Sequence, residues 1–150
     1  MKLVIQRVDE AKVTVDEAII GRISKGLLIL VGVSDTDTTD IADKMLDKAL
    51  KMRIFDDENG VMNKSILEDG GEILVISQFT LHASTKKGNR PSYIKAAKPE
   101  ISVPLYERFC KDLSRALGKE IGTGTFGADM KVELLNDGPV TICMDTKNKE

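Results

Sequence analysis

The chain has 150 residues, of which 41% are hydrophobic and 31% charged, and its formal net charge is −2. This composition is typical of a globular domain and excludes an intrinsically disordered chain. The small negative charge argues against a nucleic-acid binder with a broad basic face, although a local basic patch could still meet one end of an RNA. We expect one domain over residues 1–150.

No segment carries the signal of a membrane span or of export. The longest apolar run, GLLILVGV from Gly26, is too short to cross a bilayer. The first residues, MKLVIQRV, alternate like a strand and lack the pattern of a leader peptide. With only two cysteines, Cys110 and Cys143, we expect a cytoplasmic protein that does not contact a membrane.

The first part of the chain is predicted to be a set of strands. Residues 2–8, 11–16 and 18–23 are rich in β-branched side chains, and the short gap around Asp16-Glu17 indicates a hairpin. Residues 26–33 form a continuous apolar run, which is typical of a strand covered on both faces.

In the middle of the chain, the spacing of the apolar residues changes from that of a strand to that of a helix. Residues 41–50 place their apolar side chains on one helical face, and the acidic stretch DTDTTD (35–40) is expected to be a loop leading into the helix N-cap. A loop and short hairpin arm around Asn59-Gly60 are predicted within 56–66. Residues 72–81 should form the next strand, becoming polar toward its end.

A long irregular segment is predicted over residues 82–104, followed by a second helix that runs from Tyr106 and ends at Gly118. The last third reads as strands separated by turns, including the turn signal Asn136-Asp137-Gly138. Strands outnumber helices and do not alternate with them singly. The sequence therefore predicts an α+β fold: a curved, mostly antiparallel or mixed, barrel-like sheet with two packed helices.

Several familiar chemistries find no support in the residues. The single histidine, His82, follows a strand and is more typical of a surface or capping residue than of a catalyst. One histidine and two separated cysteines do not make a zinc site. The glycines of GTGTFG (122–127) have the wrong spacing for a dinucleotide fingerprint. We expect neither a metal nor a cofactor.

Three segments are better candidates for a site. SQFTL (77–81) places polar residues where a buried strand emerges, either as site residues or as hydroxyls that cap a loop. KKGNRPSY (86–93) offers cations in a flexible context, suited either to phosphate oxygens or to a solvated loop. NDGPVT (136–141) has a proline where a strand should restart, which is either a stiffened turn or a functional one.

Together these segments resemble the D-aminoacyl-tRNA deacylase family, in which SQFTL and NDGPVT are similar to the two signature motifs. The resemblance continues through IQRV (5–8) and TGTFGADM (123–130), so that it covers essentially the whole chain. It implies a compact homodimer with active sites at the subunit interface. It also implies a D-aminoacyl-tRNA substrate, bound by its 3′-terminal adenosine.

The resemblance gives the unusual proline a role. It implies that Gly138 and Pro139 are joined by a cis bond and inserted into the partner's site, with Arg7 holding the turn through carbonyl hydrogen bonds. Such a turn would act as a wall beside the substrate's α-carbon. L-aminoacyl groups would be excluded by contact with the wall, whereas many D-aminoacyl groups and glycine would fit.

The same resemblance suggests how the ester could be hydrolysed. Backbone N–H groups around Phe79-Thr80 would stabilise the oxyanion, and the 2′-hydroxyl of the adenosine would help to activate water. Alternatively, Thr80 is a covalent nucleophile, although no activating base is evident. The supporting residues would be Ser77 and Gln78, shaping the adenosine pocket; Phe126 and Met130, lining it; and Lys86 and Arg90, contacting RNA.

Two other functions remain open at the level of the sequence. One is a non-catalytic dimeric module that binds an RNA end through the same pocket. The other is a small-molecule esterase or amidase unrelated to RNA. Turnover of D-tyrosyl-tRNA beside L-tyrosyl-tRNA would distinguish these functions from a D-aminoacyl-tRNA deacylase.

Overall fold

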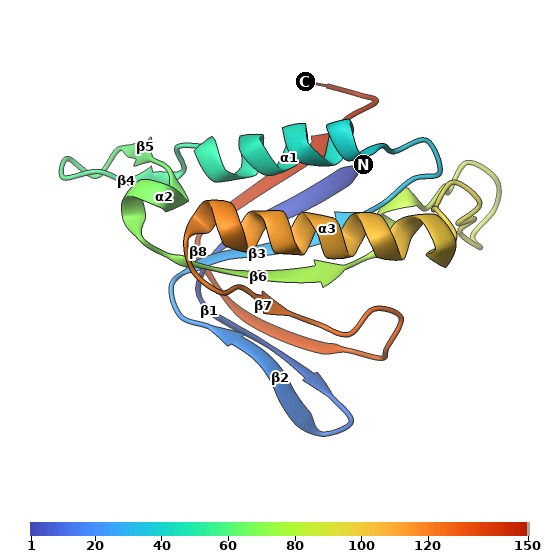
Figure 1. Ribbon diagram of the computed structural model, residues 1–150, viewed down its shortest axis with the longest axis horizontal. Coiled ribbons are helices and arrows are strands. Elements are labelled where there is room, and N and C mark those ends of the chain that lie inside the picture. The colour runs from blue at the N-terminus through green and yellow to red at the C-terminus, as the bar shows by residue number, and fades with distance from the viewer. Residues whose placement is uncertain (150) are drawn as a thin grey trace.

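The computed structural model describes residues 1–149 and shows a strongly curved sheet with two long helices packed on one side (Figure 1). The strands are β1 (Lys2–Val15), β2 (Ala18–Ile23), β3 (Gly26–Gly32), β4 (Phe55–Asp56), β5 (Met62–Lys64), β6 (Glu72–Ser77), β7 (Gly122–Thr123) and β8 (Lys131–Asp145). The helices are α1 (Thr39–Lys51), α2 (Ile66–Asp69) and α3 (Pro99–Leu117), and η1 (Phe79–His82) is a 3-10 turn.

The main sheet is mixed and curls toward closure. Its strand order is β2-β1-β3-β6-β7, and β8 pairs with β1. The β3–β6 and β6–β7 pairs are parallel, whereas β1 pairs antiparallel with β2, β3 and β8. The two ends of this order come together, because a Cβ added to Gly21 of β2 would lie 3.0 Å from the Thr123 carbonyl oxygen of β7. The predicted α+β, barrel-like mixed sheet is therefore confirmed.

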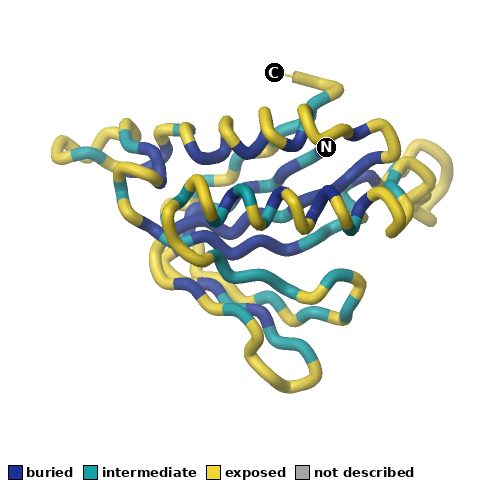
Figure 2. Tube along the Cα trace, viewed as in Figure 1, coloured by how far each residue is buried: buried dark blue, intermediate teal, exposed yellow. Residues whose placement is uncertain are grey.

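The core lies on both faces of the central strands (Figure 2). One cluster fills the space between the sheet and helices α1 and α3; it includes Leu3, Ile5, Ile29, Leu50, Phe109 and Leu113. A second cluster lies where the strands curl around one another; it includes Val8, Val13, Leu28, Leu74 and Ile76. Successive strand residues alternate between these clusters, which explains the unbroken apolar run of β3.

Local signals account for the helices. Thr38 caps α1 by accepting from the Ile41 N–H, and the apolar face predicted over 41–50 is buried. The two long helices were predicted, but the one-turn helix α2 was not. Its signal was present in the sequence as Ser65-x-x-Glu68, because these two residues form a reciprocal capping box.

Two predicted boundaries were wrong. The strand predicted over 72–81 ends at Ser77, and the chain then turns into η1. This turn packs on Gly32, where an added Cβ would lie 3.0 Å from the Gln78 carbonyl oxygen and from Leu81 Cβ. Helix α3 begins at Pro99, within the segment 82–104 that was predicted to be irregular. Proline suits a first helical turn, because that turn needs no N–H donor there.

The predicted strands 2–8 and 11–16 are one continuous strand, β1, which shifts register against both β2 and β8. The hairpins predicted around Asp16-Glu17 and Asn59-Gly60 are confirmed, and both Asp16 and Glu17 have positive φ.

Among the described residues, no helix combines the length and the apolar character needed to cross a membrane.

Candidate functional site

A cavity of about 530 Å³ opens where β3 and β6 end, beside the start of α3 and the loop before β8. Five residues singled out in the sequence line it: Ser77, Gln78, Phe79, Phe126 and Met130. Val31 and Val33 also contribute to the lining, which is mainly apolar with a few polar groups. Pockets of this size and character commonly hold a small molecule or one end of a larger one.

The hydroxyl groups along α3 are already engaged by protein carbonyls. Tyr106 donates to the Val75 carbonyl over 3.2 Å, and its ring packs on Phe126 with centroids 5.7 Å apart. Burial raises the pKa of Tyr106, so that its phenol stays protonated. Ser102 donates to the Lys98 carbonyl over 3.1 Å. These residues shape the pocket wall and are not poised as nucleophiles.

The turn after β6 fixes Thr80 and leaves two backbone donors free. The Gln78 N–H bonds the Val31 carbonyl at 2.7 Å, and the Gln78 side-chain amide donates to the Thr80 hydroxyl at 2.5 Å. Thr80 itself is outside the pocket lining. Within residues 1–149, no acceptor is found for the backbone N–H groups of Phe79 and Thr80. Free N–H groups at the start of a helical turn can bind an anion or a developing oxyanion.

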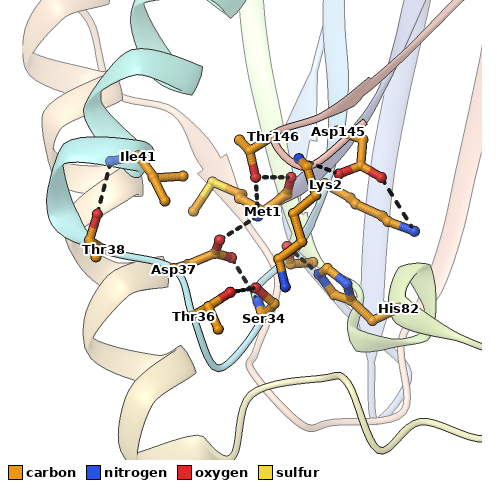
Figure 3. Close-up of polar contacts among 12 residues, drawn as sticks. Met1, Lys2, Ser34, Thr36, Asp37, Thr38, Ile41, His82, Asp145 and Thr146 are labelled. Carbon is orange, nitrogen blue, oxygen red and sulfur yellow. Dashed lines mark hydrogen bonds and ion pairs between the residues drawn. The ribbon is translucent and has the colours of Figure 1, made fainter. Parts of the chain in front are cut away.

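A buried ion pair at the start of the chain holds the turn that follows β3 (Figure 3). The Met1 ammonium lies 2.5 Å from Asp37 Oδ1, and both groups are almost fully buried. It also donates to the Thr146 hydroxyl over 2.8 Å. The other Asp37 oxygen accepts the Ser34 N–H at 2.7 Å. The carboxylate thereby fixes the turn that follows β3.

This turn is continuous with the pocket. Ser34 forms a β-bridge with Ala96, and the Ala97 N–H bonds the Val33 carbonyl at 2.9 Å. Val33, Ala96 and Ala97 all line the cavity. The expectation of a plain loop and helix cap at 35–40 was therefore incomplete, because Asp37 is buried while Thr38 caps the helix.

Two groups that could have been reactive are structural. The His82 ring bonds the Gly32 carbonyl through Nε2 at 3.0 Å, and burial lowers its pKa. His82 is only 6% exposed, so of the two predicted alternatives the surface residue is wrong, whereas the bond to the Gly32 carbonyl agrees with a capping role. Burial raises the pKa of the Cys110 thiol to about 11, which leaves almost no thiolate at neutral pH. Neither residue lines the cavity.

The second candidate region is a bulge in the middle of β8. Gln6 pairs with Thr141 and Val8 pairs with Asn136, so that residues 137–140 all lie opposite Arg7. The predicted Asn136-Asp137-Gly138 turn is therefore a bulge within one strand and does not reverse the chain. The Gly138–Pro139 peptide bond is cis, Gly138 has φ +127, and both residues are exposed.

Arg7, in the neighbouring strand β1, holds this bulge in place. It is 7% exposed, and its Nε donates to the Asp137 carbonyl at 3.1 Å and pairs with the Asp137 carboxylate at 3.2 Å. Its Nη1 donates to the Ile54 carbonyl at 2.8 Å. On the other face of β1, the Gln6 amide donates to Asn136 Oδ1 at 2.7 Å. Two neighbouring residues of β1 thus hold the first residue of the bulge and the residue just before it.

Within one chain the two regions do not form one site. None of Arg7, Gly138 and Pro139 lines the cavity. Lys86 and Arg90 lie in a third place, the exposed segment between η1 and α3. Among residues 1–149, no cluster of three or more His, Cys, Asp or Glu side chains could hold a metal ion.

The sequence did not predict that several other residues line the pocket. Tyr106 belongs to a row of apolar side chains at helical spacing, so the sequence assigned it only to the buried face of a helix. Tyr93 and Lys98 lie at the end of, or beyond, the KKGNRPSY segment, and nothing in their spacing ties them to β6. Tyr93 could have been found as the one aromatic residue in a strongly basic loop.

Comparison with known proteins gives a consistent result. Residues 4–145 match the family described as D-Tyr-tRNA(Tyr) deacylase. The chain is 77% identical to the D-aminoacyl-tRNA deacylase of Bacteroides thetaiotaomicron over 150 residues, which is the full length of both proteins. It is 61% identical, again over the full length of both, to the D-aminoacyl-tRNA deacylase of Parabacteroides distasonis.

Solved structures show the same fold. One, described as c-Myc DNA Unwinding Element Binding Protein, matches with a TM-score of 0.92 and 40% identity, covering 97% of this chain and 99% of that one. Another, described as a probable eukaryotic D-amino acid tRNA deacylase, matches with a TM-score of 0.83 and 19% identity, covering 95% of this chain and 97% of that one.

Proposed function

The chain belongs to the D-aminoacyl-tRNA deacylase family, and we propose that it hydrolyses the ester bond of D-aminoacyl-tRNA, releasing a free D-amino acid and tRNA. The pocket at the end of β6 would hold the 3′-terminal adenosine. Ser77 and Gln78 would shape its polar side, and Phe126 and Met130 would contact the base. The reaction belongs in the cytoplasm, where aminoacyl-tRNA is used.

The observation that carries the finer proposal is the separation of the two signature segments. The Gly138–Pro139 bulge is exposed and lies outside the pocket of its own chain. Beside it, Leu135 is 53% exposed and Leu134 is 38% exposed, so β8 presents apolar surface as well as the bulge. A homodimer in which each bulge enters the partner's pocket would bury this surface and join the two segments in one site.

The bulge would then discriminate between the D and L configurations at the α-carbon of the aminoacyl group. A backbone wall held by a buried arginine cannot move aside for a side chain, because Arg7 grips it from within the fold. When the ester and the α-amino group are fixed, an L side chain would meet the wall. A D side chain would point away from it, and glycine has none, so glycyl-tRNA is a further proposed substrate.

Catalysis would depend on positioning and on charge stabilisation. The free Phe79 and Thr80 N–H groups are suited to the oxyanion of the tetrahedral intermediate, and the adenosine 2′-hydroxyl would assist the attacking water. The Thr80 hydroxyl accepts a hydrogen bond from Gln78 and lines no part of the cavity, which favours a scaffold over a nucleophile. Lys86 and Arg90 would contact the phosphates of the acceptor end.

The deciding assay compares hydrolysis of D-tyrosyl-tRNA, L-tyrosyl-tRNA and glycyl-tRNA under single-turnover conditions. Selective turnover of the D and glycyl esters is expected, and equal turnover of the L ester would exclude the steric wall. A Thr80→Val variant tests the mechanism in the same assay. It should retain the rate within about tenfold if Thr80 only positions the turn, whereas complete loss with intact binding would identify a nucleophile.

A non-catalytic nucleic-acid-binding module is the rival function. It has one specific observation in its favour, since a relative with 40% identity is described as binding a DNA unwinding element. That function predicts binding of D-tyrosyl-tRNA without turnover. The same assay therefore separates the two. A small-molecule esterase would instead be indifferent to the presence of the tRNA.

A further inference from the structure

Two aromatic side chains stand at the mouth of the pocket with much of their surface in solvent. Phe79 is 54% exposed and Tyr93 is 40% exposed, and both line the cavity. Their rings meet edge to face, with centroids 5.2 Å apart and an interplanar angle of 73°. This contact fixes the rings relative to one another and leaves open aromatic surface beside the cavity. Exposed aromatic pairs are unusual unless something covers them.

The segment that carries Tyr93 is strongly basic. Residues 83–98, ASTKKGNRPSYIKAAK, contain five cations and no acidic residue, in a chain whose formal net charge is −2. The five are Lys86, Lys87, Arg90, Lys95 and Lys98, and all are exposed. None of them forms an ion pair with any residue in the described part of the chain. Lys98 also lines the cavity.

Resting on the proposed function, we propose that Phe79 and Tyr93 form a stacking subsite for the nucleotide that precedes the terminal adenosine, with Lys95 and Lys98 facing its phosphates. Aromatic faces flanked by unpaired cations are how proteins hold single-stranded nucleic acid, because every base has a π-face and every nucleotide a phosphate. The 3′ end of an aminoacyl-tRNA is single-stranded. A strand that enters the pocket with its last adenosine must pass the pocket's mouth.

A second subunit is the other occupant to consider, but the charge of the segment disfavours it. The cores of protein–protein interfaces are depleted of charged residues, and above all of lysine. Five cations without a carboxylate within sixteen residues instead match the regular negative charge of a phosphate chain. The subsite would bind one more nucleotide of the RNA besides the reacting adenosine. The enzyme would therefore bind aminoacyl-tRNA more tightly than smaller aminoacyl esters.

The test compares two substrates that differ only in the nucleotides beyond the adenosine: D-tyrosyl-tRNA and D-tyrosyl-adenosine. Tyr93→Ala should raise KM for the tRNA by about 5- to 150-fold, the range expected for losing one base–aromatic stack. The increase in KM for the adenosine ester should be at least about fivefold smaller, because that ester has no preceding nucleotide to stack on the ring, although Tyr93 also lines the cavity. Tyr93→Phe, which keeps the ring, should behave like the wild type with both substrates.

Ile94→Ala is the matched control, because Ile94 is 85% exposed, adjacent in sequence and outside the cavity lining. It should leave both KM values unchanged. Lys95→Ala should lower the slope of log affinity against log salt for tRNA by about 0.7, the value for one phosphate contact on a single strand.

Three results would overturn the subsite: an equal loss on both substrates, no loss on either, or dissociation of a dimer by Tyr93→Ala, which would assign the ring to a subunit contact. Binding of uncharged tRNA, measured in parallel, separates this proposal from the proposed function. If the wild type hydrolyses neither ester but Tyr93→Ala still weakens tRNA binding, the stacking subsite stands and the deacylase activity fails.

Discussion

The pocket at the end of β6 and the bulge of β8 are built in opposite ways. The pocket is continuous with the core, since its walls include Val31, Val33 and Tyr106, and the Met1–Asp37 pair supports its rim. The bulge is exposed and is joined to the fold chiefly through Arg7 and Gln6. A change at the pocket's support should therefore affect folding, whereas a change at the bulge should affect activity while the fold remains.

The largest effect is expected where the pocket's support is buried. Asp37→Ala leaves the Met1 ammonium without its carboxylate in a site that water does not reach. Loss of one partner from a buried pair costs about 3–5 kcal/mol, so the free energy of unfolding should fall by that amount. Urea denaturation measures it. Asp43→Ala is the control, because Asp43 pairs with Arg108 at an exposed position and should cost less than about 1 kcal/mol.

At the bulge, Gly138→Ala should lower kcat/KM for D-tyrosyl-tRNA by about 100-fold while the protein stays folded. Gly138 has φ +127, and an added Cβ would lie 3.0 Å from Val140 Cγ2 and 3.3 Å from Arg7 Nη2. The bulge must shift, and a displacement of about 1 Å near reacting groups can cost about 100-fold in kcat/KM. Gly118→Ala also introduces a side chain at positive φ, at the end of α3 with open space around it, and should keep full activity. Equal losses in the two variants would remove the bulge from the site.

A smaller effect should follow from changing how the bulge is held. Arg7→Lys keeps the positive charge but cannot donate at once toward the Asp137 and Ile54 carbonyls. Loss of about one hydrogen bond corresponds to roughly a tenfold lower kcat/KM for D-tyrosyl-tRNA. The ratio of D to L turnover should fall with it. An unchanged ratio would mean that Arg7 supports the fold and not the chiral wall.

The smallest effect concerns pH and the turn behind the pocket. Because burial lowers the pKa of His82, the unfolded chain binds a proton more readily, and stability must fall as pH drops below about 6.5 toward the folded-state pKa. His82→Gln keeps a donor for the Gly32 carbonyl but does not titrate. Urea unfolding at about pH 7.5 and about pH 5.5 should show a steeper loss for the wild type than for the variant.

The sequence predicted what depends on local pattern. Strand β2 follows from its β-branched residues, strand β3 from its continuous apolar run and helix α1 from helical spacing, and the polar end of β6 pointed to the pocket. The end of β6 could not be placed, because the chain turns there by packing on Gly32, which is remote in sequence.

The same limit applies to the bulge and to the rim of the pocket. Residues 136–138 carry a turn signal that is overridden by pairing of both halves of β8 with β1. Asp37 looked like one acid in a solvated loop, and only the fold brings the Met1 ammonium to it. Contacts between residues far apart in the chain decided each of these cases.

The central claim is that each active site combines the pocket of one subunit with the bulge of the other, and complementation tests it directly. Ala128→Trp would fill the pocket, and Gly138→Ala would displace the bulge. Each variant alone should be inactive. After mixed refolding in equal amounts, half of the dimers pair the two variants, and each of those has one intact site, so about a quarter of wild-type activity should return. Mixed dimers without any recovered turnover of D-tyrosyl-tRNA would contradict the account.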